Sequence, residues 1–408
     1  MPPTAGTAAP PATPAAAALA PVAGTFATLG MFWGTWAVAI ANVQRAFGLS
    51  DATLGVLLAV AIAVAGLTGA VAGHRAERWG TRRMLVGALA LWAVLLVAAG
   101  VAPTWPLFAV AFIACEVAAG CVDTAMNAAS AAELGGRPSA LVRFHAFFNM
   151  GAVAGALVAG LLLRAGLSWR VLWPALAIVV AGVALWTRRT PGPAGRPVPP
   201  GPVGDGSVAV PSVGDGSVAV RAPGPIARLR GDRLGMFLVI FAVAEVVEGG
   251  VDTWGVLYLR TWLAAGVLVG AGAYALGQSL AATTRGAGGG VLGRLSPRRA
   301  LLVGAVVAGI GILVESTSPV VGVAAAGLAL GAAGASLFWP LVMSDVSRRA
   351  TLSTSAVGAF TAAGYVGWVA GAPVVGWVSD TFGAARGLQL LAAMAALVAL
   401  SSLVRGDS

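Results

Sequence analysis

Two stretches that lie 216 residues apart share one pattern, SALVRFHAFFNMGAVAGALVAG at residues 139–160 and SAVGAFTAAGYVGWVAGAPVVG at residues 355–376. Aligned without a gap, they coincide at the leading Ser-Ala, at one phenylalanine and at three glycines: Phe144 and Phe360, Gly151 and Gly367, Gly155 and Gly371, Gly160 and Gly376. The same shift brings a second set into register: Gly73, Arg78, Arg82 and Arg83 fall on Gly289, Arg294, Arg298 and Arg299. One register that serves two distant segments indicates an internal duplication.

The composition is that of a membrane protein. Of the 408 residues, 58% are hydrophobic and only 10% are charged, whereas soluble proteins carry about 25% charged residues. Apolar stretches of about 18–25 residues, long enough to cross a bilayer as helices, recur along the chain. We expect an all-α membrane protein with twelve transmembrane helices, near residues 24–44, 54–74, 83–101, 105–128, 141–163, 169–187, 234–257, 264–286, 300–316, 319–343, 354–377 and 384–404.

The duplication divides these twelve helices into two pseudo-symmetric six-helix bundles, related as parallel repeats about an axis along the membrane normal. The expected bundles are residues 24–187 and 234–404. Residues 188–233 between them are rich in Pro, Gly and Arg and contain the tandem repeat VGDGSVAVPS and VGDGSVAVRA, which is typical of a flexible linker. Residues 1–23 and 405–408 are expected to be disordered tails.

The arginines indicate the orientation in the membrane. If the N-terminus is cytoplasmic, 19 of the 25 arginines lie in inner loops and 5 in outer loops. The positive-inside rule therefore predicts that both termini are cytoplasmic. Basic residues that are all Arg, with much Ala, Gly and Pro, fit a GC-rich genome, and we expect a bacterial cytoplasmic membrane. Because topology explains the net charge of +10, no nucleic-acid partner is expected.

Acidic residues lie inside one predicted span, CEVAAGCVDTAMN at residues 115–127. At about 100° per residue, Asp123 and Asn127 lie within about 20° of Glu116 on the same helix face. A carboxylate at the centre of a membrane helix costs about 2.5–3.5 kcal/mol. These side chains are therefore expected to face the interior of the bundle. Cys115 and Cys121 face different ways, which disfavours a disulfide or metal site.

A second acidic stripe, Glu245, Glu248 and Asp252, lies in the seventh predicted span. The 216-residue shift pairs the acids of both stripes with apolar residues of the other half: Ala332, Trp339 and Met343, and Leu29, Phe32 and Trp36. An asymmetric cluster favours a solute or proton site over a structural polar network, which stays the alternative. Desolvation favours the neutral form of a carboxyl group, so proton coupling is expected. His145 and Asn149 are further candidates, although His145 could simply anchor the helix at the inner interface.

The sequence GHRAERWGTRR at residues 73–83 carries a recognisable motif. Through it, the chain resembles the major facilitator superfamily over residues 24–404, with Glu77 where Asp is usual. The resemblance implies a cytoplasmic gate made by the motif, its acidic partner and a worn second copy: Gly73, Glu77, Arg78, Gly80, Arg82, Arg83, Glu133, Arg294, Arg298 and Arg299. The alternative is that these arginines only anchor the topology.

The segments CVDTAMNAASAAE at 121–133 and EGGVDTWGVLYLR at 248–260 look like the YbjJ-like, fucose-permease-like branch of that superfamily. The signature of drug antiporters in the fifth helix is broken here by Ala156 and Ala159.

We therefore expect a secondary active transporter of a small solute, coupled to protons and working as a monomer by alternating access. Efflux of an amphipathic compound and a non-transporting receptor or scaffold stay as alternatives. An enzyme is not expected, since the sequence has no metal cluster, nucleophile–base pair or Walker A motif. No cofactor is expected either.

Overall fold

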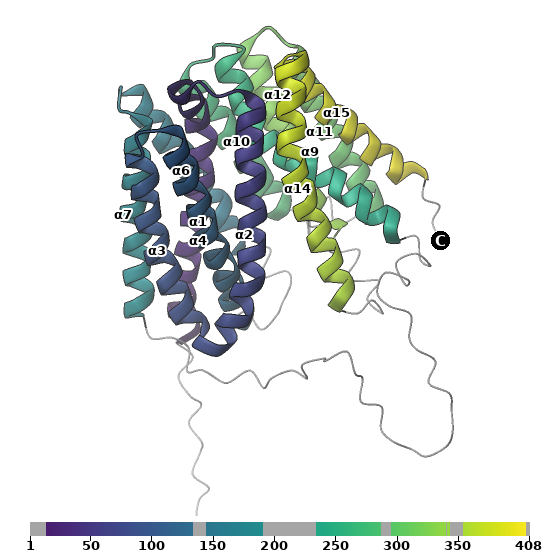
Figure 1. The fold of residues 1–408 in the computed structure, drawn as a ribbon. Helices are drawn as coiled ribbons and strands as arrows, with labels where there is room; N and C mark the ends of the chain where they lie inside the picture. The colour runs from purple at the N-terminus through teal and green to yellow at the C-terminus, as the bar shows by residue number, and fades with distance from the viewer. Residues whose placement is uncertain are drawn as a thin grey trace, which may run out of the picture.

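The structure is a computed structural model that describes residues 14–133, 144–190, 234–286, 295–339, 341–342 and 354–404. Within these residues the chain forms twelve α-helices and one short 3-10 helix, and no strand (Figure 1). The first half comprises α1 (Pro14–Phe47), α2 (Asp51–Trp79), α3 (Thr81–Val101), α4 (Trp105–Glu133), α6 (Ala146–Arg164), η1 (Trp169–Val171) and α7 (Leu172–Arg189). The second half comprises α9 (Leu234–Thr261), α10 (Val267–Gly286), α11 (Pro297–Thr317), α12 (Val321–Ala335), α14 (Thr354–Phe382) and α15 (Ala384–Val404).

The all-helical fold is confirmed, and each of the twelve predicted spans coincides with a helix. Eight helices of the described chain are long and apolar enough to cross a membrane. Among the others, α9 carries the acidic stripe, which lowers its hydropathy without shortening it.

The largest difference from a predicted boundary is at the start of the first helix. Helix α1 begins at Pro14, inside the segment expected to be a tail. The reason is local: residues 15–18 and Ala20 are alanines, which have the highest helix propensity, and proline is favoured at the first helical position. The rest of the expected tails, and the expected linker from residue 191 to residue 233, lie outside the described residues.

The repeated glycines explain how the halves are packed. Gly151 of α6 lies so close to α1 that an added Cβ would be 1.9 Å from the carbonyl oxygen of Ala27. Its counterpart in the repeat, Gly367 of α14, lies as closely against α9, where an added Cβ would be 2.2 Å from the carbonyl oxygen of Ala242. The duplicated pattern therefore marks one close helix crossing in each half, since only glycine lets membrane helices approach so far.

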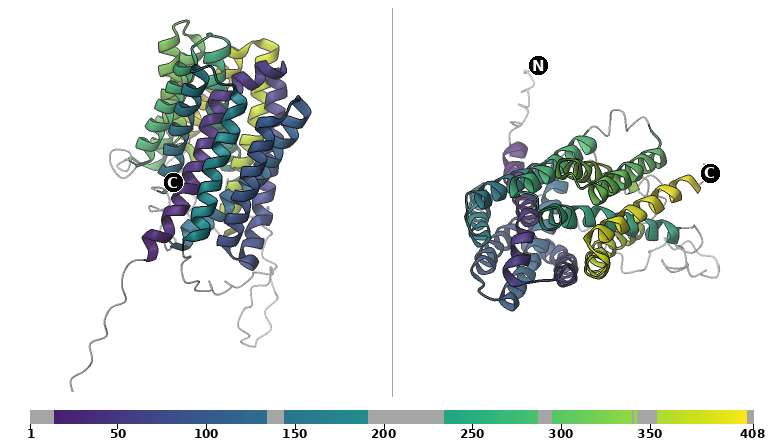
Figure 2. Two further views of the ribbon diagram at one scale, coloured as in Figure 1. Left: turned by 90° about the vertical axis from the view of Figure 1, so that its left-hand side faces the viewer. Right: turned by 90° about the horizontal axis from the view of Figure 1, so that it is seen from above.

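The two halves meet mainly along two pairs of helices, α2 with α14 and α6 with α10, and α1 also contacts α9 and α10. Figure 2, seen from above, shows the first half in purple and blue beside the second half in green and yellow. We call the end where α2 begins at Asp51 and α14 ends at Phe382 the Asp51 end. The opposite end, where α7 ends at Arg189 and α9 begins at Leu234, is the linker end.

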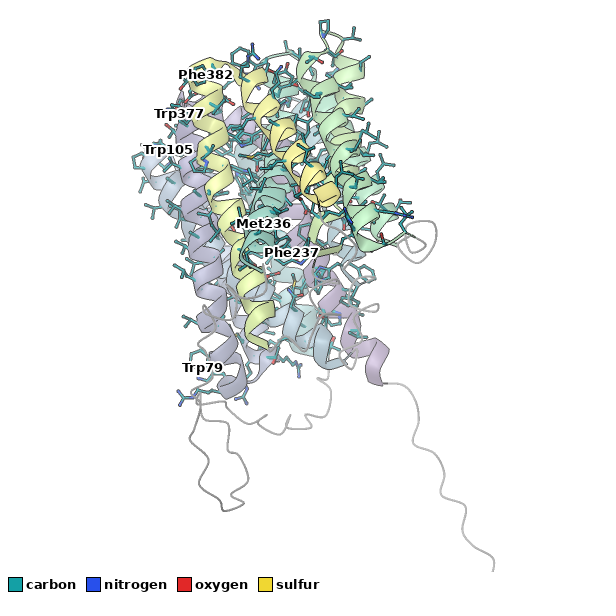
Figure 3. All side chains as sticks on the ribbon, turned by 90° about the vertical axis from the view of Figure 1, so that its right-hand side faces the viewer. Trp79, Trp105, Met236, Phe237, Trp377 and Phe382 are labelled. Atoms are coloured by element: carbon teal, nitrogen blue, oxygen red, sulfur yellow. The ribbon has the colours of Figure 1, made fainter. Side chains whose placement is uncertain are left out.

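Aromatic side chains lie near both ends of the bundle. Figure 3 shows Trp105, Trp377 and Phe382 toward the Asp51 end and Trp79 at the opposite end. Trp79, Trp377 and Phe382 are exposed. Aromatic residues at both ends are typical of proteins that span a bilayer, because their amphipathic rings favour the headgroup region.

Candidate functional site

The acids of α4 occupy different environments. Glu116 is 2% exposed, and its Oε1 has no hydrogen-bond partner among the described residues. Two turns further along the same helix, Asp123 is half-buried and its Oδ1 accepts a hydrogen bond of 3.0 Å from Nδ2 of Asn127. Asn127 therefore orients Asp123, whereas Glu116 is enclosed in the first half.

The acidic stripe of α9 is bonded to its neighbours in the second half. Nε1 of Trp368, on α14, donates to Oε2 of Glu245 at 3.0 Å. Nε2 of Gln278, on α10, donates to Oδ1 of Asp252 at 3.1 Å. Glu248, between them in the stripe, is half-buried. The stripe thus contacts α10 and α14, which pack against α6 and α2 of the first half.

One hydrogen-bond chain crosses between the halves. Asn149 of α6 donates from Nδ2 to Oε1 of Gln278 at 2.9 Å, and Gln278 in turn donates to Asp252. Asn149 and Gln278 are both buried. Amide and carboxyl groups from three helices therefore meet where the halves touch, well inside the bundle. Such groups can accept and donate hydrogen bonds to a polar solute when they separate.

Sequence reasoning named Asn149 and Asp252 but missed Gln278 and Trp368. A signal for Gln278 was present, since it is a polar residue inside the apolar segment AGAYALGQSLAA, and polar residues within membrane helices are costly. Trp368 had no such signal. His145, the other candidate of that segment, is exposed at the start of α6 and packs edge-on against Phe26, with ring centroids 5.0 Å apart.

The arginines of the motif have a structural role within each half. Nε of Arg82 donates to the Thr187 carbonyl oxygen at 3.1 Å, at the last turn of α7. Its counterpart Arg298 donates to the carbonyl oxygens of Ser402 and Leu403, at the last turn of α15. Each arginine thereby satisfies carbonyl groups at a helix C-terminus. The second, less complete copy of the motif therefore keeps this capping role.

The remaining motif residues are placed as follows. Gly80 alone separates α2 from α3 and has φ of +85°, a backbone conformation that explains the fixed glycine. Arg78, Arg83 and Arg299 are exposed. Gly73, Glu77 and Glu133 belong to α2 and α4, and Arg294 lies outside the described residues.

The halves are clasped together at the Asp51 end. The carboxylate of Asp380, at the end of α14, accepts hydrogen bonds from the backbone N–H groups of Asp51 and Ala52 at 2.9 and 2.8 Å. These N–H groups begin α2, and a carboxylate is favoured at a helix N-terminus. Arg260 of α9 donates to Oδ1 of Asn42, on α1, at 2.8 Å. Both contacts join residues of different halves, and sequence reasoning predicted neither.

A model of one family matches most of the chain. It is described as "Major Facilitator Superfamily" and matches residues 22–372. The chain is also 26% identical over 383 residues to "Membrane protein MosC" of Rhizobium meliloti, covering 93% of this chain and 88% of that protein.

Solved structures share the fold at low identity. The nucleoside transporter NupG superposes with a TM-score of 0.73 at 14% identity, covering 95% of this chain and 98% of that one. A bacterial homologue of the human lysosomal transporter Spinster, inward-facing and unoccupied, gives 0.74 at 14% identity, with 97% of each chain covered. The transporter FucP in the outward conformation gives 0.57 at 19% identity, covering 94% of this chain and 99% of that one.

Proposed function

This chain belongs to the Major Facilitator Superfamily and is a multi-pass secondary transporter rather than an enzyme, and we propose that it carries a small polar solute together with protons. The observation that carries the solute site is the buried chain from Asn149 through Gln278 to Asp252. Solute sites of such transporters lie near the midplane of the membrane, at the interface of the repeats. The hydrogen-bond chain from Asn149 to Asp252 joins the two repeats at their interface. The fucose-permease-like branch predicted from the sequence is consistent with the FucP similarity.

The orientation that we propose places the Asp51 end outside. The linker end carries the arginine-rich motif and its second copy, so the positive-inside rule assigns it to the cytoplasm of a bacterial cell. Both termini are then cytoplasmic, and the clasp at Asp380 and Arg260 closes the outer side.

Alternating access then requires the halves to open at one end and close at the other. The clasp at the Asp51 end must break for the outward-open state. The motif residues around Arg78 and Glu77, with Glu133, are proposed to close the linker end in that state. The bonds of Arg82 and Arg298 stay within their own halves, so these two arginines hold the gate helices in both states. The transporter is proposed to act as a monomer in the bilayer, without a cofactor.

Glu116, Asp123 and Glu245 are the proposed proton-coupling acids. All three belong to helices of the bundle interior, and Glu116 and Glu245 are buried. Ionising a carboxyl group in such surroundings costs desolvation energy. A proton on the carboxyl group removes that penalty and links its protonation to the state of the bundle.

The test begins with the solute. Purified protein in proteoliposomes is screened for binding and uptake with radiolabelled nucleosides, sugars and polyols, and a solute that an imposed proton gradient drives uphill into the vesicles is used further. Glu116→Gln and Asp123→Asn should abolish uphill uptake while each still exchanges labelled for unlabelled solute without a gradient. If both variants are present at the normal level and take up solute uphill at the parent rate, Glu116 and Asp123 have a structural role and do not couple protons. Proton-driven loss of solute from the cell, rather than uptake, would select the efflux alternative.

A further inference from the structure

One carboxyl group is enclosed more completely than any of the acids discussed above. Glu315, in the last turn of α11, is 0% exposed, and neither Oε1 nor Oε2 has a hydrogen-bond partner among the described residues. Buried polar groups of native proteins nearly always have a partner, and an orphaned one needs an explanation. The equivalent position of the first half is Ala99, which is buried and apolar, so the packing of the repeat does not require an acid here.

The helices around Glu315 offer it space but no counter-charge. An added Cβ at Gly255 of α9 would lie 3.1 Å from Oε1 of Glu315, and one at Gly327 of α12 would lie 2.6 Å from its backbone nitrogen. Two glycines therefore let α9 and α12 close over the carboxyl group. Helix α12 has no ionisable residue over Val321–Ala335.

The other elements packed on α11 do not neutralise it either. The ionisable residue of α15 within its described range is Arg386, which is exposed and bonded to Gln389. On α9, Asp252 and Arg260 flank Gly255 in the sequence, and each is bonded elsewhere, to Gln278 and to Asn42. An ionised carboxyl group in this position is costly. Glu315 is therefore neutral in this state, which means that it holds a proton.

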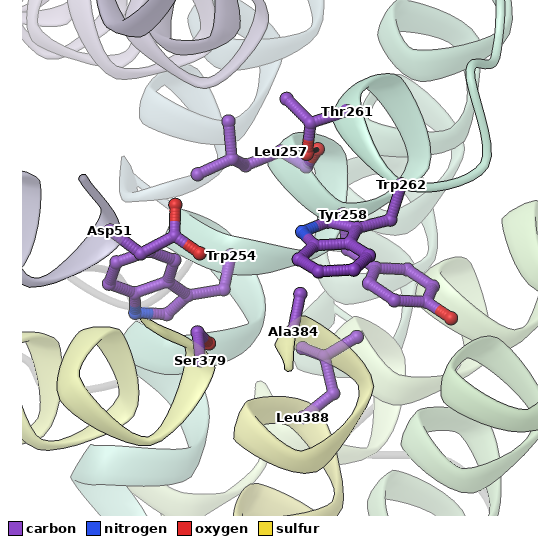
Figure 4. Close-up of a pocket in the computed structure, with 9 residues that line it drawn as sticks. All are labelled: Asp51, Trp254, Leu257, Tyr258, Thr261, Trp262, Ser379, Ala384 and Leu388. Carbon is purple, nitrogen blue, oxygen red and sulfur yellow. Dashed lines mark hydrogen bonds between the residues drawn. The ribbon is translucent and has the colours of Figure 1, made fainter. Parts of the chain in front are cut away.

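Tyr258 lies beside Glu315 and also at the Asp51 end. Tyr258 donates its hydroxyl to the carbonyl oxygen of Ser316 at 3.3 Å, directly next to Glu315 in the chain. Tyr258 also lines a small pocket at the Asp51 end, together with Asp51, Trp262 and Ser379. In Figure 4 the Tyr258 hydroxyl points away from Asp51. Tyr258 thus stands between the pocket and Glu315.

We propose that Glu315 is a proton-binding site of the second half, loaded and emptied through the pocket beside Tyr258 at the Asp51 end, and that its ionised form favours the opening of that end. The proposal rests on the proposed function for the assignment of the Asp51 end to the outside. It adds a site that lies apart from the acids of α4 and from the Asn149–Gln278–Asp252 chain.

The clasp supplies the link between protonation and opening. Helix α9 covers Glu315 at Gly255, and the same helix is tied to α1 through Arg260. When the outer end opens, this tie breaks and the last turns of α9 are released, which lets water reach the carboxyl group. Closure buries the carboxyl group again and is therefore favourable only when it is neutral. Raising the pH ionises Glu315 and shifts the protein toward the state open at the Asp51 end.

The first measurement is the infrared difference spectrum between the parent and Glu315→Gln in nanodiscs at neutral pH, with no solute. We expect the C=O band of a protonated carboxyl group, which moves on exchange into heavy water. Bands of a carboxylate in the same difference spectrum would mean that Glu315 is ionised beside a bound cation, and would overturn the proposal. If Glu315→Gln does not fold, Glu315→Met fills the same space without a polar atom.

The second measurement reports the outer end. Ser379, which lines the pocket and is buried, is replaced by Cys in a background in which Cys115 and Cys121 are Ala. A membrane-impermeant thiol reagent is then added from outside. Since the thiolate fraction of the introduced cysteine rises with pH in every variant, the readout is the labelling rate of the parent divided by that of Glu315→Gln. This ratio should rise with pH, by at most about tenfold per pH unit, the limit for one coupled proton.

Asp51 and Asp380 lie at this end in both the parent and Glu315→Gln, so the comparison between the two isolates Glu315. A ratio of labelling rates that does not change with pH would overturn the proposal and leave Glu315 as a neutral structural acid. Neither measurement needs the solute. A failure here is therefore distinct from failure of the coupling test on Glu116 and Asp123.

Discussion

Gln278 connects the two halves because one amide group both donates and accepts. Its Nε2 donates to Asp252 and its Oε1 accepts from Asn149. A carboxylate could only accept and an ammonium could only donate. Since Asn149 and Gln278 are buried, loss of Gln278 leaves the Nδ2 group of Asn149 with an unsatisfied hydrogen bond.

Gln278→Leu should therefore lower the melting temperature of the purified protein and abolish solute binding. The buried amide of Asn149 loses its partner, at a cost of about 1–3 kcal/mol. The matched control is Gln389→Leu, since Gln389 bonds only the exposed Arg386 in the described structure, and it should melt like the parent. Equal melting temperatures and equal binding for Gln278→Leu and the parent would show that the chain is dispensable.

Many close helix crossings in this protein depend on glycine. Gly151 and Gly367 are repeat partners, and each brings one helix against the backbone of its neighbour. Gly87 of α3, in contrast, has nothing within 4 Å of an added Cβ and is exposed. The glycines of the quoted repeat are therefore packing residues of α6 and α14.

Gly151→Leu should destabilise the protein, because the new side chain would force α6 away from α1. Overpacking of this kind costs at least about 1–3 kcal/mol. Gly87→Leu places the same side chain in open space and should leave the protein intact. Membrane level and thermal unfolding in detergent measure both variants, and an intact Gly151→Leu would contradict the close crossing.

At the scale of the whole molecule, the clasp at the Asp51 end sets the balance between the two open states. Asp380 bonds two backbone N–H groups of the other half, and Arg260 bonds Asn42. Hydrogen bonds to charged groups contribute about 1.5–3 kcal/mol, and about 1.4 kcal/mol changes a population ratio tenfold. Loss of the clasp should therefore shift the equilibrium measurably.

Asp380→Ala should open the Asp51 end, and this is measured as the distance between spin labels at Leu167 and Thr317, which are exposed in different halves at that end. The distance distribution should gain a longer component, which reports the outward-open state. Arg386→Ala removes an exposed charge near Asp380 without touching the clasp and should leave the distribution unchanged. An unchanged distribution in Asp380→Ala would mean that other contacts hold the outer end closed.

The sequence by itself determined every property that depends on local periodicity or on composition. The twelve helices follow from the lengths of the apolar runs, and the shared face of Glu116 and Asp123 follows from the helical repeat. The duplication also marked Gly151 and Gly367, because the same crossing recurs in both halves. Even the early start of α1 could have been predicted from the alanines that follow Pro14.

Only the tertiary structure decided which polar groups meet. Gln278 and Asn149 are 129 residues apart, and Asp380 and Asp51 are 329 residues apart. Glu315 lies near the end of a predicted span, and only the packing of α9 and α12 over it encloses its carboxyl group. The physical reason is that a side chain's partners and its access to water depend on helices brought beside it from elsewhere in the chain, and no local pattern records that placement.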